Sequence, residues 1–106
     1  MKSLKFSEPL PEMILRGKKT VTWRLFDEKN IQSGDTLLFC RKDGTAFAKA
    51  VATSVREKAF SDLTQEDYQG HEMFPSFEKT LQHYSECYRI PVTEKTNVKI
   101  IRFKLA

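Results

Sequence analysis

The stretch RGKKTVTWR, residues 16–24, decides how the rest of the chain is interpreted. Gly17 is the residue type that most readily takes the left-handed conformation after a helix, and the cations around it suit the negative end of a helix dipole. From Thr20 onward, polar and apolar residues alternate with the period of a β-strand. The stretch therefore predicts a turn from a helix into a strand, which is either a solvated turn or a functional site.

The alternation also predicts which way the strand side chains point. One set would fill the core: Val21, Trp23 and Leu25. Thr22 and Arg24 would share the opposite face, about 7 Å apart by the rise of a strand. Together with Lys19, a face with a hydroxyl and a cation suits a small anionic or carbonyl-bearing ligand. A solvated strand would show the same spacing, so both interpretations remain open.

The flanking segments predict further strands and three short helices. Strand-like runs occupy residues 4–6, 36–41, 46–55 and 97–105, the last with a possible bulge. Helical spacing follows three serines that can act as caps: Ser7, Ser61 and Ser76. Asp43-Gly44 marks a hairpin turn between two of the strands.

These elements predict an α+β domain that is mainly β. We expect a small, partly closed β-barrel of five to six strands with two to three short helices, because closure removes exposed sheet edges. Seven residues would line one interior: Val21, Trp23, Leu37, Phe39, Val51, Ile100 and Phe103. Three residues of the last helix would pack against it: Phe77, Leu81 and Tyr84.

Composition sets the class of protein. At 106 residues and 40% hydrophobic content, the chain predicts a single domain over residues 1–106. A net charge of +4 would attract phosphates weakly, which permits a nucleic-acid partner without requiring one. No apolar run approaches the roughly 20 residues that span a bilayer, and residues 1–6 lack the apolar core of a signal peptide. We expect a cytoplasmic monomer with no membrane contact.

Several familiar chemistries find no support. Residues 17–20 are similar to the tail of a phosphate-binding loop, but the upstream glycine is missing, and there is no dinucleotide fingerprint, so we expect no cofactor. His83 and Cys87 stand four apart on a helix, yet two ligands do not make a zinc site, so we expect no metal. Cys87 and Cys40 are interpreted as reduced, partly buried thiols. His71 is interpreted as a solvated loop residue.

GKKTVTWR, residues 17–24, resembles the G-x-K-x-x-T-x-R signature of ASCH domains, a family within the PUA-like barrel superfamily. The resemblance continues through IQSGD (residues 31–35), FPSFEK (residues 74–79) and residues 84–88, so that it covers nearly the whole chain. The chain is similar both to small N4-acetylcytidine amidohydrolases and to archaeal single-domain ASCH proteins.

The resemblance implies a cleft that binds RNA or a modified nucleoside. In the amidohydrolase branch, the signature lysine accepts a proton, the threonine is the nucleophile, and a glutamate ahead of the last helix donates a proton. These positions correspond to Lys19, Thr22 and Glu72. Ligand or RNA contacts are expected from four further residues: Arg16, Lys18, Trp23 and Arg24. By its place in the alternation, Trp23 would instead be a core residue.

The implied chemistry is consistent with the residue types. A threonine hydroxyl needs a neighbouring base, and a lysine can serve only if burial or nearby cations lower its pKa. Arg16, Lys18 and Arg24 are the expected source of those cations. We therefore predict a small amidohydrolase acting on a modified nucleoside. A non-catalytic RNA-binding module and a regulatory or interaction domain are the alternatives.

Overall fold

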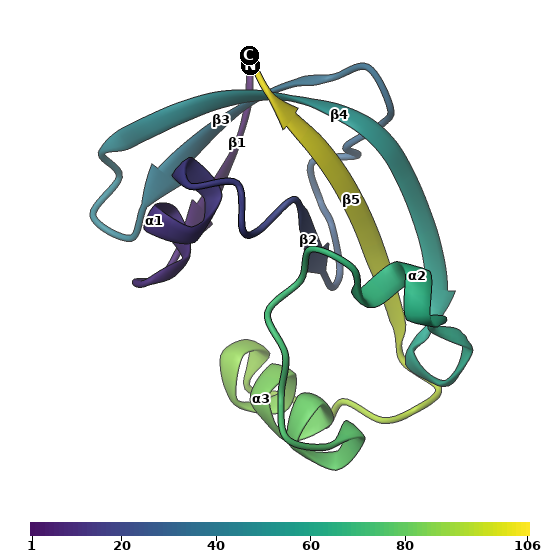
Figure 1. The fold of residues 1–106 in the computed structure, drawn as a ribbon. Helices are drawn as coiled ribbons and strands as arrows, with labels where there is room; N and C mark the ends of the chain where they lie inside the picture. Colours follow the sequence, from purple (N-terminus) through teal and green to yellow (C-terminus); the bar gives the residue numbers. More distant parts are fainter.

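The computed structural model describes all of residues 1–106 and contains one five-stranded sheet that curls into a half-barrel (Figure 1). The strands are β1 (Lys2–Phe6), β2 (Val21–Arg24), β3 (Thr36–Arg41), β4 (Ala46–Ala59) and β5 (Asn97–Leu105). Their order across the sheet is β1-β3-β4-β5-β2. The β1–β3 pair is parallel and the other pairs are antiparallel.

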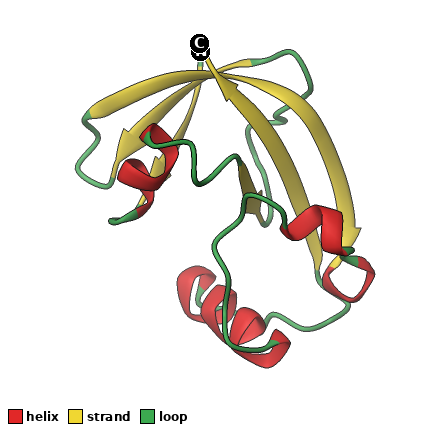
Figure 2. Ribbon diagram, viewed as in Figure 1, coloured by secondary structure: helices red, strands yellow, loops and turns green.

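Three short helices complete the fold: α1 (Leu10–Leu15), α2 (Gln65–Tyr68) and α3 (Phe77–Tyr88), with a 3₁₀ turn at Phe60–Asp62. Figure 2 shows α1 within the curve of the sheet, while α2 and α3 lie at the end of the sheet away from the two termini. The predicted mainly β, α+β class with a partly closed barrel is confirmed. None of the helices has the length and apolar character that a membrane crossing requires.

The barrel is open between its edge strands β1 and β2, and side chains bridge this seam. Arg24 of β2 donates from Nη2 to the Lys5 carbonyl of β1 at 2.9 Å. Lys29, which follows β2, donates to the Ser3 carbonyl of β1. The seam is thus held by side chains rather than by a strand ladder, which leaves β2 free to line a cavity.

The predicted single interior is wrong, because the sheet carries a core on each face. One cluster includes Leu37, Phe39 and Phe103, together with Leu4, Phe6, Ile14 and Ile101. The other includes Val21, Trp23 and Ile100, together with Phe60, Tyr84 and Val98. Neighbouring residues of β5, Ile100 and Ile101, belong to different clusters because successive strand side chains point to opposite faces. Val51 is half-buried and belongs to neither.

Local predictions were mixed. Gly17 has the expected left-handed conformation, with φ +76°, and Ser76 caps α3 by accepting from the Lys79 amide. Ser7 and Ser61 do not cap helices, because α1 begins after Pro9 and the cap of α2 is Thr64. The possible bulge was expected in the strand at residues 97–105, but the irregularity in the β4–β5 pairing lies in β4, between Ala52 and Ser54.

Two predictions about α3 and the thiols also needed correction. Phe77, at the start of α3, is 38% exposed rather than packed, whereas Tyr84 is buried. Both cysteines are free as expected, but Cys87 is exposed and only Cys40 is buried.

Candidate functional site

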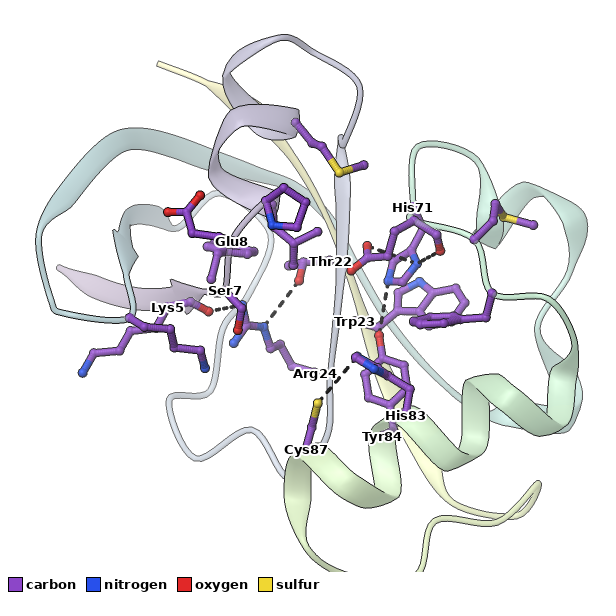
Figure 3. Close-up of a pocket in the computed structure, with 18 of the residues that line it drawn as sticks. Lys5, Ser7, Glu8, Thr22, Trp23, Arg24, His71, His83, Tyr84 and Cys87 are labelled. Atoms are coloured by element: carbon purple, nitrogen blue, oxygen red, sulfur yellow. Dashed lines mark hydrogen bonds and ion pairs between the residues drawn. The ribbon is translucent and has the colours of Figure 1, made fainter.

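A cavity of about 510 Å³ opens beside β2. Its lining comes from β2, from the segment joining β1 to α1, from the loop between α2 and α3, and from α3 (Figure 3). Thr22 and Arg24 point to one face of β2 and Trp23 to the other, yet all three line the cavity. This arrangement follows from the position of β2 at the sheet edge, where both faces reach the same space.

The loop between α2 and α3 is fixed against the start of β2. The Thr20 amide donates to the Gly70 carbonyl at 2.9 Å. Gly70 has φ +81°, and a Cβ there would lie 2.0 Å from Thr20 Oγ1. Only glycine combines this backbone conformation with so close an approach. This close contact between Gly70 and Thr20 places the next residues, His71 and Glu72, in the cavity wall.

Glu72 meets Lys19 in a largely buried ion pair. Lys19 is 1% exposed, and its Nζ donates to Glu72 Oε1 at 2.5 Å and to the Val21 carbonyl at 2.8 Å. Because Glu72 lines the cavity while Lys19 lies behind it, the carboxylate separates the ammonium from the open space.

Both members of this pair have a pKa below the usual value. Burial lowers the pKa of Lys19, an effect that Glu72 opposes and Arg24 reinforces. For Glu72, burial alone would raise the pKa, but His71 and Lys19 outweigh it and hold the pKa below its usual value. Of the three cations expected to lower the pKa of Lys19, only Arg24 does so. Arg16 and Lys18 are exposed and do not contribute to this shift.

His71 is buried rather than solvated, which corrects the sequence interpretation. Its ring stacks on Trp23 with centroids 3.8 Å apart, and its Nδ1 lies 2.7 Å from the Glu72 carbonyl oxygen. A carbonyl can only accept, so Nδ1 donates and Nε2 accepts from the Tyr84 hydroxyl at 3.3 Å. Burial, together with Lys19, lowers the pKa of His71 to about 4, so the ring is neutral at pH 7.

Thr22 is held by the guanidinium of Arg24. Arg24 Nε donates to Thr22 Oγ1 at 3.4 Å, and the guanidinium carbon lies 4.7 Å from the centre of the Phe6 ring. Thr22 is 3% exposed, so it is buried like Lys19, not a surface residue of an open strand. No hydrogen bond joins Lys19 to Thr22 in this state.

The structure therefore brings together five of the seven residues that the sequence singled out. Thr22, Glu72, Arg24 and Trp23 line the cavity, and Lys19 lies directly behind Glu72. Arg16 and Lys18 are exposed and line no part of it. The missed residues are His71 and the Tyr84 hydroxyl, whose contacts lie far along the chain and leave no periodic signal.

His83 and Cys87 lie at the exposed side of the same cavity. The His83 Nε2 and Cys87 Sγ atoms are 3.5 Å apart on neighbouring turns of α3. No third histidine, cysteine or carboxylate joins them in a group that could hold a metal ion.

Comparisons with known proteins place the fold. No family model and no curated protein matches the chain. Among solved structures, the hypothetical protein PH0355 matches over 100% of both chains, with 27% identity and a TM-score of 0.76. An ASCH domain from Lactobacillus crispatus matches with 20% identity and a TM-score of 0.63, over 90% of this chain and 69% of its own. ASCH from Zymomonas mobilis matches with 10% identity and a TM-score of 0.67, over 96% of this chain and 65% of its own. The chain therefore has an ASCH-like fold.

Proposed function

We propose that the protein is a small amidohydrolase that removes an acyl group from the exocyclic amine of a nucleoside, with N4-acetylcytidine as the representative substrate. The observation that carries the proposal is the Lys19–Glu72 pair at a cavity whose wall bears both the Glu72 carboxylate and the Thr22 hydroxyl, with Lys19 buried behind Glu72. In the amidohydrolases that the sequence resembles, these three positions hold the proton acceptor, the proton donor and the nucleophile.

The size and walls of the cavity suit a nucleoside. Its volume of about 510 Å³ lies within the roughly 300–1,000 Å³ typical of small-molecule sites. Aromatic side chains line one wall: Trp23, Phe74, Tyr84 and Tyr88. Such rings pack well against the flat face of a base.

The chemistry begins with proton transfer within the ion pair. When Lys19 gives a proton to Glu72, the pair becomes a neutral amine and a carboxylic acid, which are the base and the acid that amide cleavage needs. The amine then accepts the hydroxyl proton of Thr22 as Thr22 Oγ attacks the acyl carbon. This step requires the neutral Lys19 amine to turn from Glu72 toward Thr22 when substrate binds.

Cleavage and release complete the cycle. The tetrahedral intermediate collapses, the bond from carbon to the exocyclic nitrogen breaks, and Glu72 protonates the departing amine. Water then attacks the acyl-Thr22 ester, gives one proton to Glu72, and releases the acid while Thr22 regains its proton from Lys19. Arg24, whose Nε donates to Thr22 Oγ1, would stabilise the negative charge that develops on the acyl oxygen of the tetrahedral intermediate.

The test is to incubate the pure protein with N4-acetylcytidine and to separate the products by chromatography. We expect cytidine and acetate in equal amounts, and a loss of about a hundredfold or more in rate for Thr22→Ala. Thr36→Ala, at an exposed threonine of β3 outside the cavity, is the matched control and should keep the wild-type rate. Absence of hydrolysis by the folded wild-type protein would reject the proposal.

One observation favours a second candidate, a cavity that binds a nucleoside or RNA without cleaving it. Lys19 donates to Glu72 and to the Val21 carbonyl and makes no hydrogen bond to Thr22. Under this alternative, cytidine binds, acetylcytidine is not hydrolysed, and Thr22→Ala leaves the affinity nearly unchanged. If neither ligand binds, a regulatory or interaction domain becomes the better account.

A further inference from the structure

The charges around the cavity are not balanced. Both carboxylates that line it already have partners: Glu72 is paired with Lys19 at 2.5 Å, and Glu8 is paired with Arg41 at 2.6 Å. Neither carboxylate is therefore free to neutralise another cation in the cavity.

Three cations line the same cavity without an ion pair: Lys5, Arg24 and Lys42. None of them lies within salt-bridge distance of a carboxylate. Figure 3 places Lys5 and Arg24 on one side of Thr22, with His71 and Trp23 on the other. Lys5 and Arg24 thus give the cavity a cationic wall across the threonine hydroxyl from Trp23 of the aromatic wall, and Lys42 is a further cation of the lining.

Arg24 keeps hydrogen-bonding capacity for a ligand. Its Nε is engaged by Thr22 and its Nη2 by the Lys5 carbonyl, while Nη1 makes no hydrogen bond within the protein. Removing a guanidinium from water without an anionic partner is costly. Arginine also offers a planar fork that matches the oxygens of phosphate, while lysines such as Lys5 and Lys42 add point charges.

We propose that Lys5, Arg24 and Lys42 form a phosphoryl subsite, so that the ligand of this cavity is a phosphorylated nucleoside rather than the free nucleoside. This inference rests on the proposed nucleoside function and names its substrate class. The base would lie against the aromatic wall, and the phosphate would neutralise the cationic wall. The phosphate is either the terminal group of a mononucleotide or a diester within an RNA strand.

The experiment is a binding titration by calorimetry with four ligands: cytidine, cytidine 5′-monophosphate, inorganic phosphate and a short single-stranded oligocytidine RNA. We expect the monophosphate to bind at least tenfold more tightly than cytidine, because charge-assisted hydrogen bonds to phosphate are added. A salt dependence with a slope of about −0.7 would correspond to one neutralised phosphate. If the mononucleotide matches the RNA in affinity and slope, a terminal phosphate suffices, whereas tighter and steeper RNA binding identifies the diester chain.

Variants separate the subsite from the general positive charge of the protein. The double change Lys5→Ala with Lys42→Ala alters two exposed side chains and should weaken monophosphate binding about three- to tenfold while leaving cytidine unaffected. Arg24→Gln should weaken it about ten- to hundredfold, with thermal unfolding to check the fold. Lys104→Ala removes an exposed cation outside the cavity and should change neither affinity.

Two results would overturn the phosphoryl subsite: cytidine and its monophosphate binding equally well, or Lys104→Ala weakening binding as much as the double variant. Its failure is distinguishable from failure of the amidohydrolase proposal. Hydrolysis of acetylcytidine without any preference for the phosphorylated form would retain the enzyme and reject the subsite. Selective monophosphate binding without hydrolysis would retain the subsite and reject the enzyme.

Discussion

Lys19 Nζ and Glu72 Oε1 lie 2.5 Å apart, although 53 positions separate these residues in the chain. The contact joins the entry to β2 with the loop between α2 and α3, so it contributes to the position of the loop as well as to the chemistry of the cavity. Its two partners differ in exposure, at 1% for the Lys19 side chain and 21% for that of Glu72.

Removing one partner of this pair should destabilise the fold more than removing both. Lys19→Met would leave Glu72 without its counter-charge in a partly buried position, and we expect a loss of about 3 kcal/mol in the free energy of unfolding. Glu72→Gln added to Lys19→Met should recover more than half of that loss, because no unpaired charge remains. Urea denaturation of both single variants and the double variant provides the measurement. Simple addition of the two single effects would show that the pair does not act as a unit.

Gly70 should be far less tolerant of alanine than Gly44, although both have positive φ. A Cβ at Gly44 meets nothing within 4 Å, so Gly44→Ala should cost about 1 kcal/mol from backbone strain alone. A Cβ at Gly70 would collide with Thr20, so Gly70→Ala should cost roughly 2–3 kcal/mol and move Glu72 away from Lys19. The check is the unfolding free energy of each variant together with its cytidine affinity. Equal stabilities, with ligand binding intact in both, would argue against a tight approach at Gly70.

His71 should make the fold less stable in mild acid. Its pKa is lowered from 6.5 to about 4 by burial, so between these values the unfolded chain binds a proton that the folded chain does not. Stability is therefore retained above pH 6.5 and lost as the pH falls toward 4, by about 1.5 kcal/mol between pH 6.5 and 5. His71→Gln should flatten the dependence of unfolding free energy on pH in this window. His83→Gln, at an exposed histidine, is the control, and an unchanged slope in His71→Gln would contradict a neutral buried ring.

Local patterns in the sequence identified much of the fold. Residues 36–41 and 97–105 alternate or cluster as strands do, and β3 and β5 have the same bounds. Gly17 correctly predicted the left-handed turn, because few other residues adopt that conformation readily. The alternation after Thr20 separated Trp23 from Thr22 and Arg24 correctly, since strand parity is a local property.

Contacts between distant segments could not be predicted in the same way. His71 was assigned to solvent because its loop shows no periodicity, yet stacking on Trp23 buries it. The two separate cores were not predicted. Alternation within one strand shows which side chains share a face, but not which face of the sheet that is in the neighbouring strands. The burial of Lys19 was not predicted, because a lysine is rarely buried without a partner and its partner Glu72 lies 53 positions along the chain.

The most direct test of the central claim, that Thr22, Lys19 and Glu72 act together on an acyl amide, is the rate of N4-acetylcytidine hydrolysis in single and double variants. Wild type should release cytidine, and Thr22→Ala and Glu72→Gln should each lose most of that rate. The Thr22→Ala, Glu72→Gln double variant should be no slower than the slower single, because residues that act as one unit lose nearly everything at the first removal. Full hydrolysis by Thr22→Ala, or multiplication of the two losses in the double variant, would contradict the account.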